Sequence, residues 1–115
     1  MKTNSVIEFT PHKIASLNDL FRNTFLGGKV RLSPNVQSLD DALKQLLISA
    51  VREFKQFNED NDPHGEHDFG VVPIMGKKFY WKIDYFDTRY EFLSEDPSNP
   101  KVTNRVLTIL EACEW

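Results

Sequence analysis

The decapeptide NDPHGEHDFG, in the middle of the chain, gathers two of the three histidines of this sequence with three of its 17 acidic side chains, all groups that could bind a cation or move a proton. Carboxylate and imidazole groups are ligands for calcium and for transition metals, and imidazole is also the most frequent general base in proteins. Three kinds of chemistry therefore have to be compared at this loop: calcium binding, transition-metal binding and acid–base catalysis. The groups concerned are Asp62, His64, Glu66, His67 and Asp68.

A calcium site would use the spacing of an EF-hand loop, which the sequence follows in part. Asp60, Asp62 and His64 alternate, and Gly65 stands at the sixth position, where the loop turns sharply. Val71 occupies the position of the bidentate glutamate, and the sequence that follows is typical of a strand instead of a helix. The pattern therefore argues against calcium.

A transition-metal site would use a different subset of the loop. Its ligands would be Asp62, His64, His67 and Asp68, and it would make the chain a small metal-dependent hydrolase or nuclease. The HxxH spacing, however, lies in a loop and lacks the helical geometry that directs two imidazoles at one ion. No pair of cysteines supports the site, and His12 is distant in sequence.

Acid–base catalysis would pair a histidine with an acid, either His67 with Asp68 or His64 with Asp84. A nucleophile is missing, because Cys113 lies in no nucleophile motif and no serine lies in a nucleophile elbow. Asparagine, aspartate, proline and glycine together are typical of a hydrogen-bonded turn. We therefore predict a structural or binding loop, and a chain that has no catalytic residue, metal or cofactor.

Helices are predicted on the N-terminal side of this loop, because apolar residues recur there at spacings of three and four. Residues 1–9 are predicted to be a tail. The first helix is expected to begin near Pro11 and to end at Gly27, and the second to begin after Ser38 and to end near Asn58. Between them, KVRLS is either a short edge strand or an extended link.

Strands are predicted on the C-terminal side, where the apolar period changes to two. The segment FGVVPIM is a strand that ends in a turn at Gly76, and KKFYWKIDYFD is a second strand with two distinct faces. The last segment, TNRVLTILEACEW, is apolar on both faces and is therefore predicted to be a central or doubly covered strand. We expect a single α+β domain, with two N-terminal helices packed on a small antiparallel β-sheet.

The sheet face away from the helices is predicted to be partly exposed. Tyr80 and Phe86 lie on it, with Val106 and Leu110 as further candidates. An exposed apolar face of this kind usually marks an interface, and a homodimer is the simplest way to cover it.

The composition restricts the compartment and the partners. The chain has 115 residues, a net charge of −3 and one cysteine. The acidic balance argues against nucleic acid as a partner, and no apolar run approaches the ~20 residues of a membrane span. A single cysteine fits a reducing compartment, so we expect a soluble, cytoplasmic protein, or one that is delivered into a host cytosol.

Four segments, NDPHGEHDFG, FYWKIDYFD, SEDPSNP and TNRVLTILEACEW, resemble the DUF3768 family, and the resemblance covers about residues 14–115. The chain departs from the family pattern at His64, where an aromatic is common, and at Phe86 and Trp115, where the family has tyrosine. The family has no established activity. A small Legionella inhibitor of ubiquitin-deamidating and transglutaminating effector enzymes is similar to this family, and this resemblance implies an inhibitor.

The sequence therefore predicts a non-catalytic regulator that binds a partner enzyme, such as a ubiquitin-deamidating effector, and blocks the access of its substrate. Charged loop residues would steer the encounter, and exposed aromatic side chains would anchor it. The predicted contact residues are Asp62, His64, Glu66, His67, Tyr80, Asp84 and Phe86.

Overall fold

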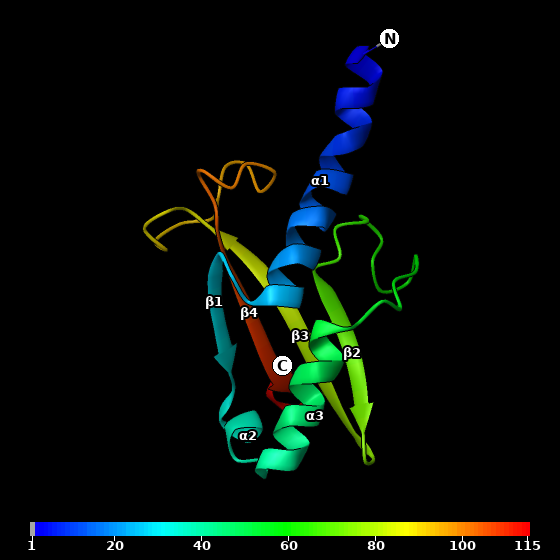
Figure 1. The fold of residues 1–115 in the computed structure, drawn as a ribbon, viewed down its shortest axis with the longest axis vertical. Coiled ribbons are helices and arrows are strands. Elements are labelled where there is room, and N and C mark those ends of the chain that lie inside the picture. The colour runs from blue at the N-terminus through cyan, green and yellow to red at the C-terminus, as the bar shows by residue number, and fades with distance from the viewer. Residues whose placement is uncertain (1) are drawn as a thin grey trace.

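A four-stranded sheet with two helices on one face forms the fold in a computed structural model, which describes the backbone of residues 2–115 and the side chains of residues 12–115 (Figure 1). The arrangement confirms the predicted α+β class. The elements follow in the order α1 (Lys2–Thr24), β1 (Gly28–Leu32), α2 (Pro34–Gln37), α3 (Asp41–Arg52), β2 (Phe69–Ile74), β3 (Lys77–Phe86), β4 (Asn104–Glu111) and the 3-10 helix η1 (Ala112–Glu114).

The sheet is mixed, so the prediction of a purely antiparallel sheet is wrong at one pair. The strand order is β1-β4-β3-β2; β2, β3 and β4 pair antiparallel, whereas β1 pairs parallel to β4, with Val30 opposite Leu107. The parallel pairing follows from the long connection through α2, α3 and the β2–β3 hairpin, which brings the chain back in the same direction. The KVRLS segment, for which an edge strand and an extended link were both open, is an edge strand. The last strand, β4, is central, as predicted.

The first helix begins earlier than expected. It starts at Lys2, so a tail over residues 1–9 and a helix start at Pro11 are both wrong. Pro11 lies within the helix, where its missing N–H removes one backbone hydrogen bond. The helix ends at Thr24, and the chain turns there with Phe25 and Gly27 at positive φ values of 59° and 92°.

The second long helix is shorter than predicted at both ends. Asp40 is its N-cap, and the carboxylate accepts a hydrogen bond of 2.8 Å from the N–H of Leu43. Ser38 instead follows the short helix α2, as its C-cap. The helix ends at Arg52, not near Asn58, and residues 54–68 continue as a loop.

The hydrophobic core lies between the helices and the inner face of the sheet. Trp81, Leu47 and Leu107 are fully buried in it, and burying each such side chain contributes about 1.5–3 kcal/mol to folding. Trp81 lies opposite Gly70 on β2, where a Cβ atom would overlap the indole ring. Glycine is therefore needed at position 70 for β2 and β3 to pair around the tryptophan.

The outer face of the sheet is covered more completely than the sequence predicts. Val106 and Leu110 are only 6% and 7% exposed. Tyr80 packs edge-on against Trp115, with ring centroids 5.4 Å apart, and also contacts Phe69. The face is thus not a flat apolar surface. In the part of the chain that the structure describes, no helix has the length and apolar character needed to cross a membrane.

Candidate functional site

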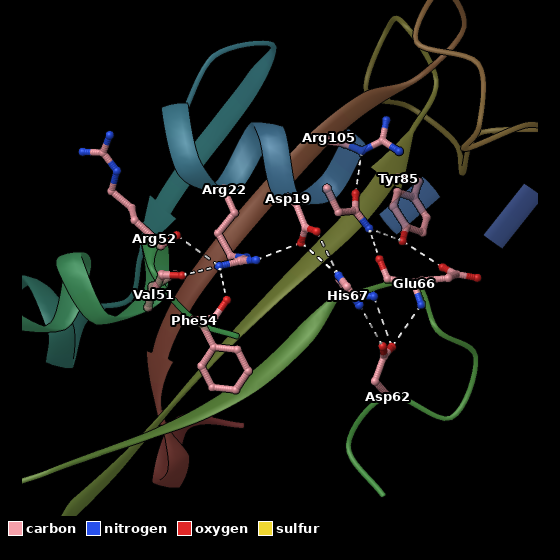
Figure 2. Close-up of polar contacts among 11 residues, drawn as sticks. Asp19, Arg22, Val51, Arg52, Phe54, Asp62, Glu66, His67, Tyr85 and Arg105 are labelled. Carbon is pink, nitrogen blue, oxygen red and sulfur yellow. Dashed lines mark hydrogen bonds and ion pairs between the residues drawn. The ribbon is translucent and has the colours of Figure 1, made fainter. Parts of the chain in front are cut away.

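The loop that follows α3 meets α1 through His67 (Figure 2). The Nδ1 atom of His67 lies 3.0 Å from both carboxylate oxygens of Asp19, and its ring stacks on Phe57 with centroids 3.9 Å apart. The Nε2 atom lies 3.7 Å from a carboxylate oxygen of Asp62. Both ring nitrogens therefore face carboxylates of the fold.

The carboxylate of Asp62 holds the loop in a tight turn by bonding to its backbone. One of its carboxylate oxygens accepts hydrogen bonds from the backbone N–H groups of Glu66, at 3.0 Å, and His67, at 3.1 Å. Gly65 and His67 have positive φ values of 68° and 57°, which lets the chain turn tightly around this carboxylate. The NDPHGEHD segment is thus a hydrogen-bonded turn, as its composition predicts.

Asn18, on α1, joins this loop to the sheet. Its side chain is fully buried, and its Nδ2 group donates to the carbonyl of Glu66 at 2.9 Å and to the hydroxyl of Tyr85 at 2.8 Å. The Tyr85 hydroxyl in turn donates to the Glu66 carboxylate at 2.8 Å. The amide oxygen of Asn18 accepts a 2.6 Å hydrogen bond from Nε of Arg105, on β4.

Arg105 extends the same network to the SEDPSNP loop. Its Nη2 atom donates to the carbonyl of Pro97 at 2.6 Å. Burial lowers the pKa of the Arg105 guanidinium, while the nearby Tyr85 and Glu66 act in the opposite direction. Burial also raises the pKa of the Tyr85 phenol, which therefore stays protonated and available as a hydrogen-bond donor.

Arg22, one turn after Asn18, holds the C-terminal end of α3. Its buried guanidinium donates to the carbonyls of Val51, Arg52 and Phe54, at 2.9 to 3.2 Å, and to the carboxylate of Asp19 at 2.9 Å. Burial lowers its pKa, and the hydrogen bond to Asp19 opposes this shift. These contacts explain why the helix stops at Arg52, because its last carbonyls are bonded to an arginine instead of to further turns of helix.

The structure brings together only part of the predicted contact set. Asp62, Glu66 and His67 form one cluster, as described above. His64 is exposed on the loop. The remaining three residues, Tyr80, Asp84 and Phe86, lie on the outer face of the sheet. There the carboxylate of Asp84 pairs with the ammonium group of Lys82 at 3.0 Å.

The alternative metal ligands, Asp62, His64, His67 and Asp68, are not assembled around one point. Over residues 12–115, whose side chains are described, no three His, Cys, Asp or Glu side chains are placed to share a metal ion. Burial raises the pKa of the Asp68 carboxyl, and the negative charge of Glu66 adds to the shift.

A hollow of about 260 Å³ lies beside His67, between α1 and the loop, and Lys55 and Phe57 line it together with Asp19. A general base needs a ring nitrogen that can reach the substrate proton. The Nδ1 atom of His67 is bonded to Asp19, which holds α1 against the loop, while Nε2 lies 3.7 Å from Asp62, beyond hydrogen-bond distance.

Sequence reasoning missed the residues of α1 and β4 that complete the network. One signal was present: Asn18 and Arg22 follow Ile14 at intervals of four and so lie on the apolar stripe of the helix. Arg105 likewise shares a strand face with Leu107 and Ile109. A polar residue at a core position needs a buried partner.

Comparison with known families gives one match. The model of DUF3768, described as a protein of unknown function, matches residues 32–114. The chain belongs to the DUF3768 family. The match includes the NDPHGEHD turn, Tyr85 and Arg105, whereas α1 lies outside it. No curated protein and no solved structure matches the chain. The similarity to the Legionella inhibitor stays a prediction.

Proposed function

We propose that this DUF3768 chain is a non-catalytic regulator that acts by binding a protein. One observation carries the proposal: the reactive side chains of the turn are bonded to the fold itself. Asp62 bonds backbone N–H groups, Glu66 accepts from Tyr85, and His67 lies between two carboxylates. Groups held in this way fix the shape of the turn, which suits a surface that a partner protein recognises.

The regulator would act by covering a partner enzyme where its substrate enters. The partner we propose is an effector that deamidates or transglutaminates ubiquitin, on the strength of the family resemblance. The exposed tip of the loop, with Glu59, Asp60 and His64, would be one contact and would suit a basic groove. A rigid loop of this kind loses little conformational entropy on binding.

An inhibition assay tests this function. Purified chain is added in increasing amounts to a ubiquitin-deamidating effector, and the deamidated ubiquitin is quantified by mass spectrometry. We expect activity to fall to a residual level near a one-to-one ratio, and the His64→Ala variant to inhibit more weakly. Full effector activity with the chain at about 10 μM would contradict the proposal, because a complex with a Kd of about 1 μM would then be about nine-tenths formed.

Elemental analysis of the purified chain distinguishes the regulator from the alternative, a small metal-dependent hydrolase or nuclease. Near-stoichiometric metal that is lost in His67→Ala would favour the enzyme. The predicted homodimer is tested in parallel by size-exclusion chromatography with light scattering.

A further inference from the structure

A trough runs along β4 on the face of the sheet turned away from α1 and α3. Its floor consists of Val106, Thr108 and Leu110. Side chains of β1 form one wall and side chains of β3 the other. The trough comprises two adjoining hollows, of about 600 and 500 Å³, which share Arg31, Phe86 and Val106 as lining residues.

The β1 wall is positively charged. Lys29 and Arg31 occupy alternate positions of the strand, so both side chains point to the outer face, and both are exposed. Among the described side chains, neither forms an ion pair with a carboxylate. The ammonium group of Lys29 lies 3.9 Å from the ring centroid of Tyr90.

The carboxylates of the trough already have partners. Asp84 pairs with Lys82 at 3.0 Å. Glu114 accepts hydrogen bonds from the Ser33 hydroxyl, at 2.6 Å, and from the backbone N–H groups of Asn35 and Glu111. These bonds lower the pKa of Glu114 even though burial of the carboxylate opposes the shift. Among the described side chains, the trough thus has two cations without a carboxylate partner, Lys29 and Arg31, whereas its carboxylates are paired or hydrogen-bonded.

The dimensions of the trough suit an extended peptide. The floor residues Val106, Thr108 and Leu110 are alternate residues of one strand, so they span about 13 Å at roughly 3.3 Å per residue. Phe86 and Tyr90 lie at one end and provide aromatic surface. A strand of four or five residues laid along β4 would contact Thr108 and the aromatic rings of Phe86 and Tyr90, and acidic side chains at its β1 edge would lie against Lys29 and Arg31.

We infer that the trough binds an extended acidic segment of the partner protein. The inference rests on the proposed function and specifies the chemistry of the partner. A second copy that docked through the same face would offer Lys29 and Arg31 no carboxylate without a partner among the described side chains. A nucleic acid would have to approach a chain of net charge −3 with only these few cations available.

Titration with a defined peptide tests the inference. The probe is a capped five-residue peptide of alternating glutamate and valine, added to ¹⁵N-labelled full chain, and backbone amide shifts are recorded by NMR. We expect the shifts to concentrate in β1 and β4, and the affinity to fall as salt is added. Arg31→Glu should weaken binding at least about tenfold, which corresponds to about 1.4 kcal/mol. Lys55→Glu, an exposed lysine on the helix side, should leave the affinity unchanged.

Several results would overturn the inference. One is an equal response to the same peptide with lysine in place of glutamate. Others are stronger binding of an oligothymidylate, shifts confined to the helix side, and self-association that Arg31→Glu abolishes.

Failure of the trough assignment can be distinguished from failure of the proposed function. If Arg31→Glu still inhibits the effector while peptide binding at the trough is absent, only the trough assignment is wrong. Peptide binding at the trough without inhibition would remove the effector as the partner.

Discussion

At the scale of single residues, the network depends on one uncharged side chain that both donates and accepts. The amide of Asn18 donates two hydrogen bonds and accepts one, and so connects α1 to Glu66, Tyr85 and Arg105. A carboxylate at this position would have no donor, and an aliphatic side chain would have neither donor nor acceptor. The residue is therefore a structural connector, even though it lies beside the most reactive segment of the sequence.

Asn18→Ala tests this role. We expect a loss of about 2–4 kcal/mol in the free energy of unfolding, because the buried Arg105 Nε atom and the Glu66 carbonyl lose their partners. Urea denaturation measures the change, and Ser16→Ala, at an exposed position of the same helix, serves as the matched control and should stay within about 0.5 kcal/mol of the parent. Equal stability of the two variants would show that the network adds nothing to the fold.

The sequence predicts half of this network. Asp62, Glu66 and His67 are close in sequence, and their turn composition is enough to group them. Their partners are not close: the contacts of Asn18 with Glu66 and Arg105 join residues 48 and 87 positions apart. No local pattern encodes such pairs, although a polar residue within an apolar stripe indicates that a partner exists.

At the scale of elements, the turn of the β2–β3 hairpin contains one residue that fits its backbone conformation and one that does not. Met75 and Gly76 both have positive φ, 50° and 80°, as two-residue hairpin turns require. Glycine adopts this conformation freely, whereas methionine is strained in it. Met75 is also exposed, so its side chain contributes little packing in return.

Met75→Asn is therefore expected to stabilise the protein. Asparagine tolerates the left-handed conformation, and relief of the strain should raise the free energy of unfolding by about 0.5–1 kcal/mol. Thermal unfolding followed by circular dichroism measures the change as a higher Tm. Met75→Val, which is β-branched, should lower the Tm at the same site. If valine is tolerated as well as asparagine, the turn has a different conformation in solution.

The same scale separates what could be predicted of the fold from what could not. The alternation in β3 identified its buried face correctly, because Trp81 and Ile83 point into the core. The end of α3 was missed because it depends on Arg22, a residue of another helix. The pairing of β1 was left open, since a five-residue strand has too few residues for a clear period.

At the scale of the whole molecule, the helix layer and the sheet share polar as well as apolar contacts. Arg22 of α1 bonds the end of α3 and lies over the ring of Trp81, whose indole belongs to β3. Such contacts couple the layers, because neither can open without exposing unsatisfied groups of the other. We expect the domain to unfold as one cooperative unit.

Two probes test this cooperativity. In a Trp115→Phe background, fluorescence reports only Trp81 in the core, while far-ultraviolet circular dichroism reports mainly the helices. Both signals should follow the same urea transition, with one midpoint and one slope. A helix signal that decays at lower urea would mean that α1 and α3 separate from an intact sheet.

The position of β4 has a consequence for biosynthesis. The middle of the sheet is built from residues 104–111, so a ribosome-bound chain that ends before them has only a hairpin and an unpaired first strand. The apolar side chains of Val30 and Leu32 then stay exposed to water until β4, the strand that pairs with β1, has been translated. The sheet therefore cannot be completed until residues 104–111 have been translated, and until then the apolar face of the first strand is exposed to aggregation.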